Sequence, residues 1–229
     1  MESQGSVPGY VLNQFSMDEY NGYFRIVTTE NVTHYFNEGG IASAEQEKTR
    51  NHLFVLDESM NIVGSIEDLA RGESIYSARF MGDTGYFVTY RQVDPLFTVD
   101  LSTPSEPKIL SELKVPGFSN YLHPFGDGLL LGFGQNSDEE SGEIQGLKLS
   151  MFDTSDPAAV AEKHSELLGE KYMWSNAIGN HKAILVDSEK NLIGFPAENE
   201  YMLYSYSPES GFQKIAQLTL EADGPGDMD

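Results

Sequence analysis

The side chains most suited to binding a ligand in this sequence are a guanidinium, two imidazoles and an indole, contributed by Arg79, His123, His181 and Trp174. Polar and aromatic groups of this kind are typical of sites for anionic or carbohydrate ligands. Two of them also have simple structural explanations, because Arg79 can pair with a carboxylate and His181 can lie in an ordinary turn. We therefore treat all four as candidate contacts to an unknown protein or carbohydrate ligand.

Local catalytic and cofactor motifs are missing from the sequence. It has no Gly-x-Ser-x-Gly elbow, no phosphate-binding glycine loop with Lys and Ser or Thr, and no His-Glu-x-x-His zinc helix. The five histidines are too far apart to make a local metal motif, and a chain without cysteine has no thiolate ligand or cysteine nucleophile. The sequence therefore predicts a protein without catalytic residues, cofactor or metal site.

An acidic loop at residues 136–143 has some features of a calcium-binding loop. Asn136, Asp138 and Glu140 offer suitable oxygens at alternating positions. The turn glycine falls one position late, however, and Leu147 stands where a bidentate Glu is required. We interpret the loop as a solvated insertion between two strands.

A second possible cation-binding feature is an aspartate that recurs where a strand ends, at Asp57, Asp100 and Asp153. An aspartate at such a position commonly accepts hydrogen bonds from the backbone N–H groups just beyond it. We expect this turn chemistry, rather than cation binding, to explain the recurrence.

Composition and charge exclude several classes of partner. The chain of 229 residues has 36 acidic and 14 basic side chains, a formal net charge of −22, which repels nucleic-acid phosphates and anionic lipid headgroups. No apolar run approaches the roughly 18 to 20 residues that a membrane-spanning helix needs. Hydrophobic residues make up 39% and aromatic residues 11%, which is enough for a packed core. We expect a folded protein that binds neither nucleic acid nor the membrane interior.

The chain repeats one pattern four times: an alternating apolar strand, an aspartate, a small polar turn and another strand. The pattern occurs at residues 53–57, 96–104 and 149–157, and residues 201–208 keep the strand and turn without the aspartate. A hairpin-like pair of strands precedes each occurrence, so each unit has four short strands. The first strand of each unit is expected at residues 14–17, 76–81, 121–125 and 177–181. Helical signals are confined to residues 43–48 and 67–71, which predict a turn or two of helix at most.

Repeated four-strand units of about 43 to 53 residues, without helical crossovers, favour an all-β protein and, within that class, a β-propeller of about four blades of four antiparallel strands. The domain is expected to span residues 10–220 between flexible termini at 1–9 and 221–229, with blades at 12–73, 76–117, 119–170 and 175–220. The innermost strands of a propeller line its central channel. This expectation places Arg79, His123 and His181 on innermost strands and Trp174 just before the fourth blade.

Residues 76–117, and most specifically 91–97, resemble bacterial and archaeal secreted proteins that carry a C-terminal β-propeller distantly related to Trp-Asp repeats. The resemblance covers nearly the whole chain and implies an extracellular or cell-surface location. It implies no particular activity, because the family has no established one. Within it, Arg91, Gln92 and Asp94 are expected to form a polar network that holds a turn. The sequence lacks an export signal and members of the family are longer, so we interpret the chain as part of a larger protein.

Two functions from different classes follow. The first is a noncatalytic binding or scaffolding module of an exported protein, with a purely structural spacer as its simplest form. The alternative is a polysaccharide hydrolase or lyase, in which carboxylates from separate blades converge at the channel mouth. The sequence also leaves three arrangements open: a closed four-bladed monomer, which we favour, a ring closed by two chains head to tail, and an open arc.

Overall fold

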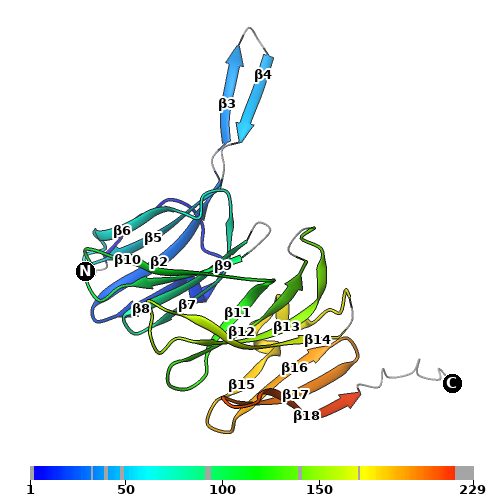
Figure 1. The fold of residues 1–229 in the computed structure, drawn as a ribbon. Helices are drawn as coiled ribbons and strands as arrows, with labels where there is room; N and C mark the ends of the chain where they lie inside the picture. Colours follow the sequence, from blue (N-terminus) through cyan, green and yellow to red (C-terminus); the bar gives the residue numbers. More distant parts are fainter. Residues whose placement is uncertain are drawn as a thin grey trace, which may run out of the picture.

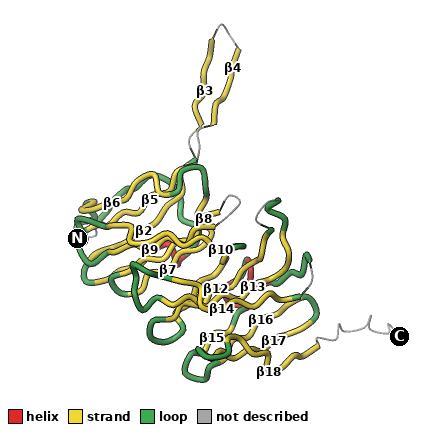
Figure 2. Tube along the Cα trace, in the orientation of Figure 1, coloured by secondary structure: helices red, strands yellow, loops and turns green. Residues whose placement is uncertain are grey.

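The computed structural model describes residues 3–31, 33–38, 41–46, 49–90, 94–138, 141–169 and 171–219, of which 33–38, 41–46, 90 and 94 are described by their backbone alone. Almost all of this chain is strand and loop, and helix is confined to short 3-10 turns (Figure 2). The all-β class predicted from the sequence is confirmed.

Sixteen of the described strands form four antiparallel sheets of four strands each, which we call blades 1 to 4 (Figure 1). Blade 1 has the order β1-β2-β5-β6, made of Met17–Tyr20, Tyr23–Glu30, Arg50–Leu56 and Ile62–Leu69. Blade 2 runs from β7 to β10, made of Ser74–Met81, Thr84–Tyr90, Asp94–Asp100 and Lys108–Val115. Blade 3 runs from β11 to β14, made of Phe118–Pro124, Leu129–Ser137, Ile144–Asp153 and Ala161–Leu168. Blade 4 runs from β15 to β18, made of Leu185–Asp187, Leu192–Ala197, Glu200–Ser207 and Gly211–Thr219.

Each blade is a meander: strands that follow one another in the sheet also follow one another along the chain, apart from the hairpin inserted in blade 1. The chain therefore completes one sheet before it begins the next. In blade 1 a separate hairpin, β3 (Thr33–Glu38) with β4 (Ile41–Gln46), is inserted between the second and third strands and projects away from the sheets (Figure 1). Four antiparallel four-stranded sheets in this order are the architecture of a four-bladed β-propeller, as the repeat predicts.

Hydrophobic clusters join consecutive blades because alternate residues of each strand point to the same face. Leu53 of blade 1 packs with Phe87 of blade 2, and Val88 of blade 2 packs with Leu130 of blade 3. Blades 3 and 4 share the largest of the three clusters, whose buried members include Phe133, Leu149, Met151, Phe195 and Tyr204.

Basic side chains add polar links across two of these boundaries. Arg25 on β2 donates to the carbonyl of Gly82 in blade 2 at 2.6 Å, and Arg79 on β7 donates to the carbonyl of Leu122 in blade 3 at 2.8 Å. Within the described residues, no hydrophobic cluster joins blade 4 to blade 1, and the two blades lie at opposite ends of the row in Figure 1. The two ends meet instead through the segment before β1, where Phe15 packs against the cluster of blades 3 and 4.

The recurrent aspartates act as turn residues, as predicted. The carboxylates of Asp57, Asp100 and Asp153 each accept the backbone N–H two residues ahead, at 2.9, 2.9 and 3.0 Å. Hydrogen bonding lowers the pKa of all three carboxyls. In blade 4, where the aspartate is missing, the hydroxyl of Ser207 accepts the N–H of Glu209 at 3.2 Å.

The first strand predicted for blade 4 is wrong. Residues 177–181, expected as a strand, belong to two 3-10 turns, η2 (Asn176–Ile178) and η3 (His181–Ala183), and the blade begins at β15. The reason is local capping: the hydroxyl of Ser175 accepts the N–H of Ala177, and the side chain of Asn180 accepts the N–H of Lys182, both at 3.1 Å. In the same way, Asn13 caps η1 (Gln14–Ser16), where the sequence predicted the start of a strand.

The two short helical signals are also wrong where the structure describes them. Residues 43–46 belong to β4, whose cross-strand pairing with β3 overrides a weak local propensity for helix. Residues 67–69 end β6, where Leu69 pairs with Asn51 of the neighbouring strand. Residues 47–48 lie outside the described part of the chain, as do residues 220–229.

Candidate functional site

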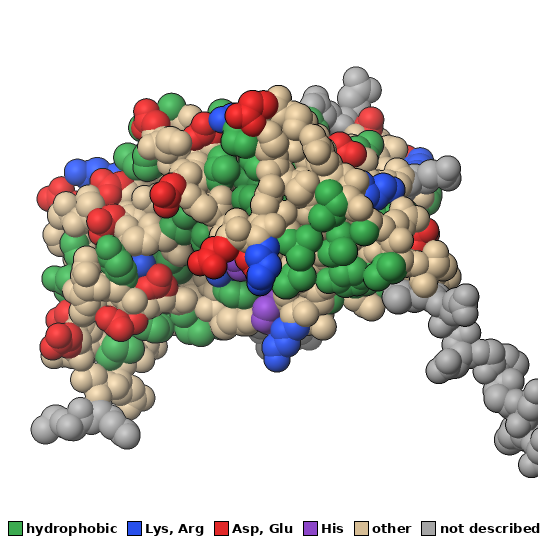
Figure 3. Space-filling view, turned by 90° about the horizontal axis from the view of Figure 1, so that it is seen from below, with side chains coloured by type: hydrophobic (Ala, Val, Ile, Leu, Met, Phe, Trp, Pro, Cys, Tyr) green, Lys and Arg blue, Asp and Glu red, His purple; other side chains and the backbone are tan. Residues whose placement is uncertain are grey.

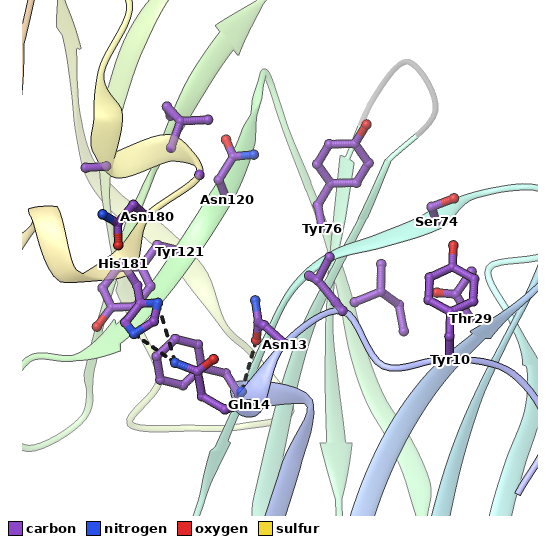
Figure 4. Close-up of a pocket in the computed structure, with 16 residues that line it drawn as sticks. Tyr10, Asn13, Gln14, Thr29, Ser74, Tyr76, Asn120, Tyr121, Asn180 and His181 are labelled. Carbon is purple, nitrogen blue, oxygen red and sulfur yellow. Dashed lines mark hydrogen bonds between the residues drawn. The ribbon is translucent and has the colours of Figure 1, made fainter.

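A cavity of about 620 Å³ lies where segments of several blades meet (Figure 4). The segment before blade 1, the starts of β7 and β11, and the turns η2 and η3 before blade 4 surround it. A volume of this size falls in the range of small-molecule sites. Its described polar and aromatic lining residues are Tyr10, Asn13, Gln14, Phe15, Thr29, Ser74, Tyr76, Asn120, Tyr121, Asn180 and His181.

Backbone pairing holds the walls of the cavity in place. β7 and β11 lie side by side, and the hydroxyl of Ser77 donates to the carbonyl of Ser119 at 2.7 Å. On the opposite wall, Tyr10 and Thr29 exchange two backbone N–H···O bonds of 2.9 Å, which fasten the N-terminal segment to β2. Tyr10 therefore projects from backbone that is fixed by hydrogen bonds, and Tyr76 and Asn120 lie beside the link between Ser77 and Ser119.

Capping of the 3-10 turns orients two of the lining amides. The side-chain oxygen of Asn13 accepts the N–H of Phe15 at 2.9 Å, and that of Asn180 accepts the N–H of Lys182. Because the oxygen is engaged, each amide keeps its NH₂ group as a donor. Figure 4 shows the Asn13 nitrogen directed into the cavity.

His181 links the two ends of the row of blades. Its Nε2 lies 2.8 Å from the side-chain nitrogen of Gln14, and its ring meets the edge of Phe15 at a centroid distance of 5.0 Å. The imidazole of His181 and the amide of Gln14 are therefore in hydrogen-bond contact across the two ends. His181 thus lies in the cavity wall, as a turn residue of η3 rather than on an innermost strand.

Arg79 lies behind the cavity floor and does not line it. Its guanidinium carbon lies 4.0 Å from the centroid of Phe15 and 5.4 Å from that of Tyr121, and its nitrogens donate to the carbonyl of Leu122. Burial lowers the pKa of Arg79. Its hydrogen-bond partner is therefore a backbone carbonyl rather than the carboxylate considered from the sequence.

His123 belongs to the same group behind the floor. Its Nδ1 and the hydroxyl of Tyr121 lie 2.6 Å apart and share a hydrogen bond. Burial, together with the nearby charge of Arg79, lowers the pKa of His123 from 6.5 to about 4, so the imidazole is neutral at pH 7. Burial also raises the pKa of the Tyr121 phenol, and the charge of Arg79 opposes this shift.

The neutral state of His123 predicts a pH dependence of stability. Unfolding restores a pKa near 6.5, so the unfolded chain binds a proton in the range where the folded chain does not. We expect stability to fall as the pH drops from about 6.5 towards 4. The loss from this one residue is about 1 to 2 kcal/mol after allowance for its partial exposure.

Urea denaturation at several pH values measures this effect. His123→Gln keeps a hydrogen-bonding side chain beside Tyr121 but cannot titrate, so its stability should depend less on pH over the same range. Equal pH slopes for both proteins would contradict the assignment.

Trp174 lies outside the cavity. Its side chain is 54% exposed, and its carbonyl accepts the N–H of Glu198 at 3.1 Å. Of the four residues proposed from the sequence, only His181 lines the cavity, while Arg79 and His123 support it from behind. Arg91, Gln92 and the side chain of Asp94 lie outside the described part of the chain.

Sequence reasoning missed the amides and tyrosines of the lining. One signal was available for two of them: Asn13 and Asn180 are asparagines that cap turns. Tyr10, Tyr76 and Asn120 carry no such signal, because only the packing of distant segments brings them together.

The acidic loop forms a turn in its described residues. The carboxylate of Asp138 accepts the N–H of Ser141 at 2.9 Å, and that of Glu143 contacts Lys171 at 2.7 Å and the hydroxyl of Tyr172 at 2.6 Å. In the described ranges no three His, Asp or Glu side chains gather as a metal site would require. The same part of the chain contains no helix of the length and apolar character that crossing a bilayer requires.

Comparison with known proteins identifies the family. The model of the family described as "Beta propeller domain" matches residues 1–227. An uncharacterized protein of Archaeoglobus fulgidus is 42% identical over 205 residues, which cover 90% of this chain and 29% of that protein. An uncharacterized protein of Methanocaldococcus jannaschii is 39% identical over 200 residues, which cover 87% of this chain and 29% of the relative. The chain thus spans less than a third of the length of these curated relatives.

Proposed function

Because this chain belongs to the beta propeller domain family, we propose that it is a noncatalytic binding module whose ligand occupies the cavity between the blades. One observation carries the proposal: neutral amide, hydroxyl and aromatic side chains from separate segments converge on a single cavity of about 620 Å³. Convergent polar groups in a partly apolar pocket are the usual features of a ligand site.

The alternative of a polysaccharide hydrolase or lyase receives less support from this site. Glycoside hydrolysis by the common mechanisms needs two carboxyl groups about 5 to 10 Å apart. The described residues that line the cavity carry amides, hydroxyls, aromatic rings and one imidazole, and none of them is an Asp or Glu. The lining therefore favours binding over acid–base chemistry at this position.

Blocking the cavity tests the proposed function. Gly179 lines the cavity, has φ −105°, and a Cβ added there would meet no atom within 4 Å, so Gly179→Trp can fill the space without backbone strain. A screen of saccharides, peptides and metabolites by thermal shift should find a compound that stabilises the natural protein. At a concentration of about 100 times Kd the gain is about 2.7 kcal/mol, or roughly 5 to 10 °C in Tm.

The matched control is Gly179→Ala, which changes the same backbone position but leaves most of the space. We expect the shift in Tm to persist in Gly179→Ala and to disappear in Gly179→Trp. A shift that persists in both variants would place the ligand elsewhere, and a screen without any shift would contradict the binding function.

We further propose that the chain is a monomer. The N-terminal segment supports this proposal because it already packs on blade 1, where Gly5 lies against Met60 and Leu56. Light scattering should give the mass of one chain, 25.4 kDa. Twice that mass would support the dimeric ring instead.

The proposed location is extracellular or at the cell surface, as part of a longer protein. The resemblance to exported propellers supports it, and so does the strongly acidic composition, which keeps an exposed protein soluble. Digestion of intact cells by an added protease should release fragments of the native protein. Protection until the cells are lysed would contradict this location.

A further inference from the structure

We propose that the ligand of the cavity is a neutral carbohydrate, an inference that rests on the proposed function and names its ligand class. The cavity offers an aromatic wall and an amide wall. Figure 4 shows Tyr10 and Tyr76 on one side, with Asn120, Asn180 and His181 on the other. A sugar ring has the matching character, with apolar C–H faces and hydroxyl groups around its edge.

The amide wall includes an acceptor that no protein group satisfies. The side-chain oxygen of Asn120 is buried and has no hydrogen-bond partner in the structure. A buried acceptor left unpaired is costly, so the Asn120 amide is stabilised when a movement brings this oxygen to a donor. Asn120 lines the cavity, and we expect ligand binding to rotate its amide so that the oxygen accepts from a bound hydroxyl group.

The same cavity also presents donors. The oxygens of Asn13 and Asn180 are engaged by backbone N–H groups, which leaves their NH₂ groups available. A site that offers both an unpaired acceptor and free donors suits hydroxyl groups, because each hydroxyl can donate one hydrogen bond and accept others.

The aromatic wall supplies a surface for stacking. The side chain of Tyr10 is 52% exposed although its backbone is fixed to Thr29 on β2. An exposed aromatic ring on ordered backbone loses little conformational entropy when a ligand covers it. The apolar face of a sugar ring can therefore pack on Tyr10 while its hydroxyls reach the opposite wall.

Charge selects against ionic ligands. The described lining residues include no Lys, Arg, Asp or Glu, and the chain as a whole carries −22. A phosphate, sulfate or uronate would enter a negative field, and the guanidinium of Arg79 lies behind Phe15, where it donates to the carbonyl of Leu122. An ammonium group would find no carboxylate among the described lining residues. A neutral saccharide meets neither penalty.

Isothermal titration with a panel of saccharides tests the inference. The panel contains neutral mono-, di- and trisaccharides, uronate-containing oligosaccharides, and neutral peptides of similar size. We expect a neutral saccharide to bind, and Asn120→Ala and Tyr10→Ala each to weaken its affinity about 5- to 10-fold, as the loss of one hydrogen bond or one stacking surface predicts. Trp174→Ala is the matched control, because this exposed aromatic residue lies outside the cavity, and it should change the affinity less than twofold.

The outcomes separate the ligand class from the function. A uronate or a peptide that binds in preference to neutral saccharides, and that Gly179→Trp excludes, would overturn the carbohydrate inference and leave the binding function standing. A panel in which nothing binds would overturn the inference, and the broader screen described above decides the function separately. If Asn120→Ala does not fold, Tyr10→Ala and Gly179→Trp still decide where the ligand binds. A neutral saccharide whose affinity falls in Trp174→Ala but not in the cavity variants would overturn the site.

Discussion

Phe133→Ala should lower the free energy of unfolding by about 3 to 5 kcal/mol, the usual cost of removing a fully buried phenylalanine. Phe133 on β12 is 0% exposed, and its ring centroid lies 4.8 Å from that of Phe195 on β16. It therefore sits at the boundary between blades 3 and 4, where the neighbouring sheets cannot collapse into the space left by a missing ring. A large cavity should remain in the core.

Urea denaturation followed by circular dichroism measures this loss. Leu218→Ala in β18 is the control, because Leu218 is 58% exposed and its truncation should change stability by no more than about 0.5 kcal/mol. A loss below about 1 kcal/mol for Phe133→Ala would mean that the boundary between blades 3 and 4 is not close-packed in solution.

Arg79→Ala should cost about 3 kcal/mol and should also weaken ligand binding. The substitution removes hydrogen bonds from a charged donor to the carbonyl of Leu122, which leaves a buried acceptor unpaired, and it removes the stacking of the guanidinium on Phe15. Phe15 lines the cavity, so a loss of its support moves the cavity floor. Arg79 is a positioning residue in this account and does not touch the ligand.

Two further substitutions distinguish these effects. Arg79→Lys keeps the charge but lacks the planar fork that lies on Phe15, so it should recover only part of the stability. Arg79→Met keeps the length of the side chain without charge or donors. Full stability of Arg79→Met would show that the guanidinium does not hold blades 2 and 3 together, and unchanged ligand affinity in all three variants would remove Arg79 from the support of the cavity.

The amino-acid sequence determined the architecture. Alternation of apolar and polar residues is a local property of a strand, and it sets which face of each sheet is buried whatever lies beyond it. The aspartates at positions 57, 100 and 153 act through backbone groups two residues away, so their role in turns also follows from local sequence. Repetition of the unit then made the four sheets predictable.

Only the tertiary structure decided the site. Gln14 and His181 lie 167 positions apart, and no local pattern indicates that they bond or that Phe15 separates Arg79 from the cavity. The strand predicted at residues 177–181 does not form, because capping hydrogen bonds from Ser175 and Asn180 stabilise 3-10 turns there. These bonds outweigh the short apolar pattern that predicted a strand. The alternation of buried and exposed residues along a strand depends on residues close together in the sequence. A cavity depends on which distant segments of the chain pack against one another. Its lining residues therefore share no sequence pattern by which they could be predicted.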